Sequence, residues 1–132
     1  PNYASVYFDF DCGGWQTEGW VSSNIKSNIA GFLGFLDFKL DKDYGSIERK
    51  KLNFQIKEQF ISVRVKTSKD VIINLHVNDK KIKPVKLTSS DDFKEIKWKV
   101  KKQDEVLDLN SLSVVFKGKP GTKIELDYIK SV

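Results

Sequence analysis

Apolar and polar side chains alternate over much of this chain, and the alternation is clearest between residues 71 and 78. Successive side chains of a strand point to opposite faces, so residues of one parity share a face. One parity is entirely aliphatic and predicts a face packed against a core: Val71, Ile73, Leu75 and Val77. The other parity carries Asn74 and His76, which are hydrogen-bonding groups. We therefore expect this strand to present a polar surface that can hold a ligand.

The preceding stretch, residues 60–67, follows the same pattern, with aliphatic side chains on one parity and Arg64 on the other. If the two stretches are neighbouring strands, Arg64, Asn74 and His76 share one outward face, about one strand spacing of roughly 5 Å apart. Gln55 has the outward parity of the strand before them and would extend this face. The alternative interpretation is a solvated convex sheet that binds nothing.

Alternation of the same kind predicts strands along most of the remaining chain, at residues 3–10, 19–21, 31–40, 52–56, 82–87, 96–100, 112–116 and 124–128. Polar and glycine-containing breaks separate these stretches, and residues 41–45 are expected to form a loop. No long stretch has a helical period, and residues 105–112 would hold at most one helical turn. About nine or ten short strands at this spacing predict an all-β protein, either an antiparallel sandwich or a barrel.

The composition is that of a single globular domain. The chain has 132 residues, of which 39% are hydrophobic and 12% aromatic, and no apolar run approaches the roughly 20 residues of a membrane helix. The net charge of +5 comes from lysines spread over many segments, which indicates a solvated surface more than a nucleic-acid face. The chain begins at Pro1 and contains no Met, so we expect it to be a piece of a larger protein.

The candidate chemistry favours binding over catalysis. Cys12 is the single cysteine and His76 the single histidine, so neither an internal disulfide nor a Cys- or His-based metal cluster can form. The sequence has no glycine-rich phosphate loop, nucleophile elbow or Cys/His arrangement, and no pair of carboxylates stands out by its spacing. An enzymatic function is therefore not expected.

Short motifs at both ends and in the middle resemble the β-jelly-roll carbohydrate-binding modules, a superfamily with a galactose-binding-like fold. The stretch Phe-Asp-Phe-Asp-Cys-Gly at residues 8–13, followed by Glu-Gly-Trp at residues 18–20, is similar to their opening strand and glycine turn. Residues 71–85 resemble their central hairpin, and residues 121–129 resemble their last strand. The resemblance spans nearly the whole chain. It implies one domain over residues 1–132 with two antiparallel sheets in jelly-roll topology.

The resemblance also implies a structural calcium ion that ties the first strand to the last. The matching acidic positions are Asp11 and Asp127, and Asp9 would supply a further carboxylate from the first strand. Calcium takes hard oxygen ligands, and backbone carbonyls can complete the shell. The ending departs from the commonest one, because Tyr128 stands where a second acid would be.

Recognition of a sugar needs an exposed aromatic ring and planar polar groups. Trp15, in a glycine-flanked loop, is the first candidate ring, and its alternative is a loop tryptophan folded over the core edge. Tyr44 would rim a groove, unless it is an ordinary loop tyrosine. Trp20 and Trp98 have core parity and are expected to be buried. The predicted ligand-binding set is Trp15, Tyr44, Gln55, Arg64, Asn74 and His76.

These expectations combine into one functional hypothesis. The chain would be a secreted or cell-surface, monomeric carbohydrate-binding module that tethers the catalytic domain of its parent chain to β-linked glycans such as β-glucan, mannan or xylan. Neither nucleic acid nor membrane is expected as a partner. The alternative hypothesis is a structural or interaction domain of the same fold without a glycan site.

Overall fold

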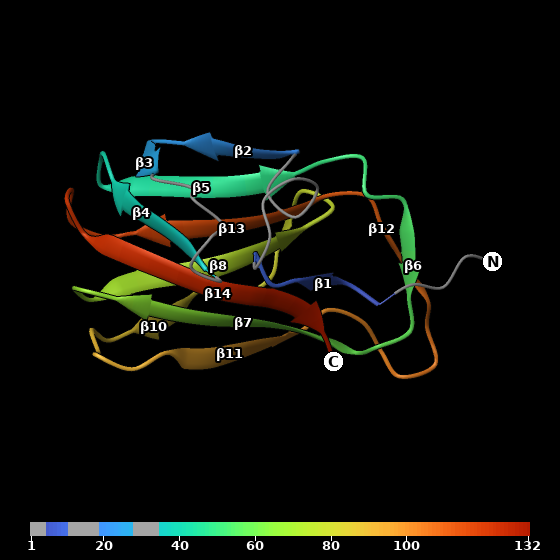
Figure 1. Ribbon diagram of the computed structural model, residues 1–132. Helices are drawn as coiled ribbons and strands as arrows, with labels where there is room; N and C mark the ends of the chain where they lie inside the picture. Colours follow the sequence, from blue (N-terminus) through green and yellow to red (C-terminus); the bar gives the residue numbers. More distant parts are fainter. Residues whose placement is uncertain (1–4, 11–18, 28–34) are drawn as a thin grey trace.

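The computed structural model describes residues 5–10, 19–27 and 35–132, and in these residues it is an antiparallel β-sandwich with jelly-roll topology (Figure 1). The described residues contain fourteen strands and no helix, and therefore no helix that could cross a membrane. The strands form two six-stranded sheets and a small two-stranded sheet. The predicted fold class is confirmed.

The first layer, which we call the β7 sheet, has the strand order β11-β7-β14-β4-β3, with β1 pairing to another part of β14. Its strands are β1 (Tyr7–Phe8), β3 (Ile25–Ser27), β4 (Leu36–Leu40), β7 (Phe60–Thr67), β11 (Lys94–Lys99) and β14 (Lys123–Ser131). The pairing of β1 with β14 joins the beginning and the end of the described chain.

The second layer, which we call the β8 sheet, has the order β10-β8-β13-β5-β2, with β9 pairing to the end of β8. Its strands are β2 (Trp20–Ser23), β5 (Tyr44–Arg49), β8 (Val71–Val77), β9 (Lys80–Lys81), β10 (Val85–Leu87) and β13 (Leu112–Lys117). Strands β6 (Phe54–Ile56) and β12 (Leu107–Leu109) pair separately at one end of the sandwich (Figure 1).

The aliphatic parity of both central strands packs into the core between the two layers. Val63 and Val65 of β7, and Ile73 and Leu75 of β8, have no exposed surface. Full burial of such a side chain stabilises the folded state by about 1.5–3 kcal/mol. The inward predictions from sequence are therefore confirmed for these strands, and Trp98, which is 3% exposed, is buried as expected.

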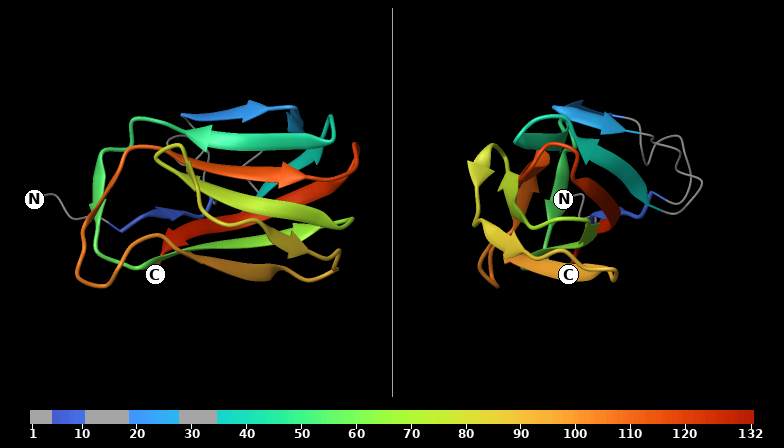
Figure 2. Two further views of the ribbon diagram at one scale, coloured as in Figure 1. Left: turned by 180° about the vertical axis from the view of Figure 1, so that it is seen from behind. Right: turned by 90° about the vertical axis from the view of Figure 1, so that its left-hand side faces the viewer.

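The arrangement of the two central strands differs from the prediction. Strand β7 lies in one sheet and β8 in the other, with β14 and β11 beside β7, and β13 and β10 beside β8. The chain crosses from one layer to the other at residues 68–70, and Figure 2 shows the two layers from behind and from one end. Alternation specifies which side of a strand faces the core, but both sheets present their apolar side to the same core. Parity therefore could not assign the two strands to one sheet.

Two further segments differ from the sequence-based expectation. Residues 44–49 form strand β5, although residues 41–45 were expected to be a loop. The strand was not predicted because Ile47 is its one large apolar side chain on the inward parity, so no alternation is visible. Gly45 also faces inward, where a Cβ atom would lie 2.9 Å from the Ile25 side chain, so a larger residue does not fit. Residues 107–109 form strand β12, in the segment where a helical turn was considered.

Candidate binding groove

A groove with a volume of about 510 Å³ lies on the outer face of the β8 sheet. Strands β5, β8 and β13 form its floor, and the segment of residues 80–86 that follows β8 forms a wall through Lys81, Ile82 and Pro84. The residues that line the groove are Tyr44, Ser46, Ile72, Asn74, His76, Lys81, Ile82, Pro84, Val115 and Lys117. The groove thus includes three of the six predicted ligand-binding residues.

The register of the three floor strands brings these side chains together. Lys117 of β13 is the partner of both Tyr44 and Ile72. One step along, Val115 is the partner of both Ser46 and Asn74. Residues directly opposite one another on one face have Cβ atoms about 4.5–5.5 Å apart, so each row is a set of touching neighbours.

Tyr44 and Ile72 supply exposed apolar surface to the groove. Tyr44 is 46% exposed and Ile72 is 45% exposed, although both belong to regular strands with buried neighbours. The two side chains flank Lys117 in one row across the sheet, and each can pack against the C–H face of a sugar. The prediction that Tyr44 borders a groove is confirmed, while its assignment to a loop is wrong, because Tyr44 begins β5.

The wall is fixed by three hydrogen bonds to its surroundings. The Ile82 N–H donates to the Leu75 carbonyl at 3.0 Å, and the Lys83 N–H donates to Asn74 Oδ1 at 2.9 Å. From the other sheet, Trp98 Nε1 donates to the Lys83 carbonyl at 2.6 Å. Because the Asn74 oxygen accepts from the wall, its NH₂ group is the part that can donate to a ligand. A wall held from both sides presents its side chains with little loss of conformational entropy on binding.

His76 lies half-buried in the groove next to Lys81, its partner on β9. Burial and the positive charge of Lys81 lower the pKa of His76, against the opposing effect of Glu48 and Asp79. A histidine with a lowered pKa is neutral near pH 7, with one ring nitrogen donating and the other accepting. His76 can therefore bond to a hydroxyl group in either direction.

Arg64 does not share this face, so the predicted grouping of Arg64 with Asn74 and His76 is wrong. Arg64 points outward from the β7 sheet, where Nη1 lies 2.5 Å from Asp127 Oδ2 and the guanidinium lies 4.7 Å from the Phe93 ring centre. The physical reason is the crossing of the chain between layers after β7, which places the outward sides of β7 and β8 on opposite surfaces of the molecule.

Gln55 is also absent from the groove. It belongs to β6 in the two-stranded sheet, and its Nε2 donates to Asp108 Oδ1 on β12 at 2.9 Å. A shallow cleft of about 390 Å³ beside it is lined by Asn53, Gln55, Asp108 and Asn110 and contains no aromatic ring. The prediction that Gln55 extends the polar face is wrong, because β6 joins neither large sheet.

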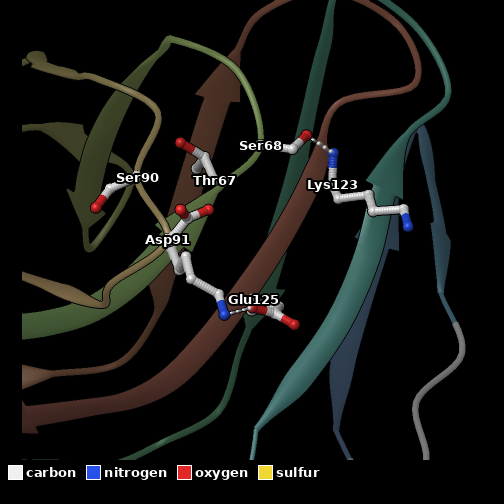
Figure 3. Close-up of a pocket in the computed structure, with 7 residues that line it drawn as sticks. Thr67, Ser68, Ser90, Asp91, Lys123 and Glu125 are labelled. Carbon is white, nitrogen blue, oxygen red and sulfur yellow. Dashed lines mark hydrogen bonds and ion pairs between the residues drawn. The ribbon is translucent and has the colours of Figure 1, made fainter.

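A smaller cleft of about 210 Å³ lies at the far end of β7 (Figure 3). The Lys123 N–H donates to Ser68 Oγ at 2.8 Å, and Lys66 lies 2.7 Å from Glu125, as the dashed lines in Figure 3 show. Lys66 has a raised pKa through its hydrogen bond to Glu125. These polar groups bind one another, which leaves fewer of them for a ligand than in the groove on the β8 sheet.

The predicted calcium ligands are only partly within the described residues. Asp11 lies outside them, as does Trp15, the remaining predicted sugar-binding residue. The carboxylate of Asp127 is paired with Arg64, and a guanidinium at that distance disfavours a second cation there. Within the described ranges, no group of three acidic, histidine or cysteine side chains could hold a metal ion. Because Asp11 lies outside the described residues, the calcium site of Asp9, Asp11 and Asp127 stays a prediction.

Sequence reasoning missed several groove residues, above all Lys81 and Lys117. Lysines at a turn and at a strand end are usually solvated, and nothing in their local pattern distinguishes them. The available signal was the density of lysine in the wall, where residues 80–86 hold four in seven. The sequence does not show where these lysines lie, because their position beside the groove depends on the pairing of β9 with β8.

Comparison with known proteins shows the fold. No protein-family model matches the chain, and no curated protein matches it. Solved structures do: a family 29 carbohydrate binding module from Piromyces equi superposes with a TM-score of 0.63 at 22% identity, covering 97% of this chain and 90% of that one. Two mutants of a second family 29 module each superpose with a TM-score of 0.65. The mutant complexed with cellulohexaose is 17% identical and covers 98% of this chain and 92% of its own. The mutant complexed with mannohexaose is 12% identical and covers 97% and 92%.

Proposed function

We propose that this domain binds glycan chains in the groove of the β8 sheet. The observation that carries the proposal is the convergence of an exposed ring and two planar hydrogen-bonding groups, Tyr44, Asn74 and His76, in one groove with a fixed wall. Sugars offer both apolar C–H faces and hydroxyl groups, and these two kinds of protein group complement them.

Each residue has a distinct part in this proposal. Tyr44 and Ile72 pack against a sugar ring, Asn74 donates from its amide nitrogen, and neutral His76 donates to one hydroxyl and accepts from another. These groups stand on β5 and β8, the two strands that flank β13 in one sheet, so they can contact more than one unit of a chain. The rigid floor limits the entropic cost of binding.

The fold comparison supports this proposal from an independent side. Modules that share this fold are complexed with cellulohexaose and with mannohexaose, both of which are chains of hexose units. We extend that class of ligand to the present chain on the strength of its own groove.

We further propose that the domain acts without catalysis, as a tether that holds a polysaccharide-degrading catalytic domain of its parent chain on the glycan outside the cell. Glycoside hydrolysis uses two carboxyl groups that flank the scissile bond. The groove lining among the described residues contains no aspartate or glutamate. Tethering raises the local concentration of substrate around the attached enzyme.

Calorimetric titration and gel retardation with soluble glycans test the function. The panel holds neutral β-glucan, xylan and mannan together with acidic chains, and at least one is expected to retard the domain and release heat. Amide resonances of residues 72–76, 81–84 and 115–117 should shift on titration, because these residues surround the groove. Absence of heat, retardation and shifts with every glycan would overturn the proposal in favour of a structural or interaction domain.

A further inference from the structure

The groove is positively charged. Lys81 and Lys117 line it, together with a histidine and no carboxylate among the described residues. The wall beside it contains lysines at positions 80, 81, 83 and 86. Lys86 pairs with Ile72 from the side opposite Lys117, so one row across the sheet contains a lysine on each side of Ile72.

The two lining lysines have no ion-pair partner among the described residues. In the described part of the chain, the ion pairs engage other cations, and neither Lys81 nor Lys117 takes part in one. Glu48, one step beyond the groove on β5, lies 3.5 Å from Lys50 and is thereby paired. The charge of Lys81 reaches the groove interior, since it contributes to the lowered pKa of His76.

The spacing of the two lysines suits an extended ligand. Lys81 is the partner of His76, and Lys117 is the partner of Ile72, four residues earlier on β8. Four residues of strand span about 13 Å, so the rows that hold the two lysines are about that far apart. That distance exceeds one sugar ring, so the lysines would contact different units of a chain, and the unit beside Lys117 would pack on Tyr44 or Ile72 in the same row.

We propose that the ligand of this groove is an anionic glycan, a chain whose sugar units carry carboxylate or sulfate groups. The inference rests on the proposed glycan-binding function and specifies the class of ligand. Lys81 and Lys117 bind the acidic groups as compact point charges, a geometry that accepts either carboxylate or sulfate. Nucleic acid is also a polyanion, but the described groove offers the single ring of Tyr44 and no succession of aromatic rings for stacking bases.

The first experiment compares chains of different charge on the intact domain. Polygalacturonate, dextran sulfate, neutral β-glucan, neutral mannan and single-stranded DNA are titrated at low and at high ionic strength. Two exposed ion pairs of ordinary strength predict an affinity for at least one acidic glycan about tenfold above that for the neutral chains. The difference should shrink at high ionic strength because salt screens exposed charges. The two acidic glycans distinguish carboxylate from sulfate.

Matched double variants then locate the effect. In the variant Lys81→Ala/Lys117→Ala, the ratio of acidic to neutral affinity should fall about tenfold. The control is Lys39→Ala/Lys123→Ala, which removes the same charge from two paired, exposed positions on the β7 sheet and should leave the ratio unchanged. Thermal unfolding of both variants verifies the fold.

The outcomes distinguish the preference for anionic glycans from the proposed glycan binding itself. Neutral chains that bind as well as acidic ones would overturn the inference and leave glycan binding intact. An equal fall in both double variants would attribute the preference to net charge and overturn the assignment to the groove. If DNA binds as tightly as the acidic glycans, the groove recognises polyanions in general, and the assignment of an anionic glycan as its ligand is wrong. If no glycan binds, both proposals fail.

Discussion

The two outer faces of the sandwich carry similar kinds of side chain and use them differently. On the β7 sheet, polar groups bind one another in the pairs Arg64–Asp127, Lys66–Glu125 and Tyr128–Glu95. Phe93 on that face is covered by cations, with Arg64 at 4.7 Å and Lys66 at 5.0 Å from its ring centre. On the β8 sheet, Tyr44 and Ile72 are nearly half exposed, and the charges of Lys81 and Lys117 have no ion-pair partner among the described residues.

Because the polar groups of the β7 face are paired with one another, polar groups on a sheet do not by themselves indicate a binding site. A charge already paired within the protein must lose that partner before it can bind a ligand, which offsets much of the gain. A group without an internal partner binds at no such cost. The β8 face is therefore the surface suited to recognition, while the β7 face stabilises its own sheet.

The largest predicted difference between the two faces is the effect of removing Tyr44. Replacement by alanine should lower glycan affinity about tenfold or more, roughly 1.4 kcal/mol, because the ring is the main apolar contact in the groove. The unfolding midpoint should hardly change, since Tyr44 is 46% exposed. The control is Tyr7→Ala, which removes a ring that is 51% exposed on β1 of the other sheet. Equal losses in both variants would contradict the assignment of the site to the β8 face.

Trp98 tests whether the paired β7 layer supports the groove of the other layer. In Trp98→Phe the hydrogen bond to the Lys83 carbonyl is lost, and the free energy of unfolding should fall by about 0.5–1.5 kcal/mol. Glycan affinity should fall by a few-fold, because the wall loses one of its supports. Trp20→Phe is the matched control, since the Trp20 indole nitrogen has no hydrogen-bond partner among the described residues. Denaturant titration measures the free energy of unfolding, and calorimetry measures the glycan affinity. If both variants bind the glycan equally well, the hydrogen bond from Trp98 does not support the groove.

The pair Arg64–Asp127 should affect stability and not binding. A double-mutant cycle with alanine at both positions is expected to give a coupling of about 0.5–1 kcal/mol in denaturant unfolding, as both side chains are partly exposed. Glycan affinity should be the same in all four proteins of the cycle. A fall in affinity in Arg64→Ala would return the binding surface to the β7 sheet, where the sequence alone had suggested it.

His76 should give the smallest effect, a dependence on pH. The folded protein holds the pKa of His76 below its ordinary value, so the unfolded chain takes up a proton first as the pH falls. The free energy of unfolding contributed by this group is full above the ordinary histidine pKa of about 6.5 and decreases as the pH drops through it. Because His76 is the single histidine of the chain, its imidazole resonances report the pKa directly.

The variant Lys81→Ala sharpens this measurement. Removal of the neighbouring positive charge should raise the pKa of His76, although burial still holds it below the ordinary value. Lys39→Ala, on the other sheet, should leave the pKa of His76 where it is. A pKa of His76 at or above that of a model peptide would contradict the electrostatic description of the groove.

Much of the fold follows from the sequence because alternation is a local property. The inward parity of β7, β8 and β13 could be derived from their own residues, and the buried positions match it. In β14 the predicted parity holds for Ile124 and Leu126 and fails at Tyr128, because the register shifts and Ile129 is buried instead. The division of strands between the sheets depends on where the chain crosses the core, and no single strand encodes this. The pairing of Arg64 with Asp127 was equally hidden, because it needs the register shift between Leu126 and Tyr128 in β14.

The candidate site was predictable in the same uneven way. Asn74 and His76 stand out because their strand is otherwise aliphatic, and Tyr44 because it follows a polar turn. Lys81 and Lys117 come from a turn and from the end of a strand, and they become neighbours of the site only through pairing with β8. Local pattern thus identified Asn74, His76 and Tyr44 and missed the two lysines, whose place in the site depends on strand pairing.

The bond from Trp98 to the wall also provides an optical reporter within the domain. The indole is 3% exposed and donates a hydrogen bond to the segment that borders the groove, although Trp98 itself belongs to the opposite layer. Fluorescence of an indole depends on its exposure to water and on the partner of its N–H group. In a protein whose other tryptophans, Trp15 and Trp20, are replaced by phenylalanine, the emission wavelength of Trp98 would report changes in the wall of the groove without an added dye.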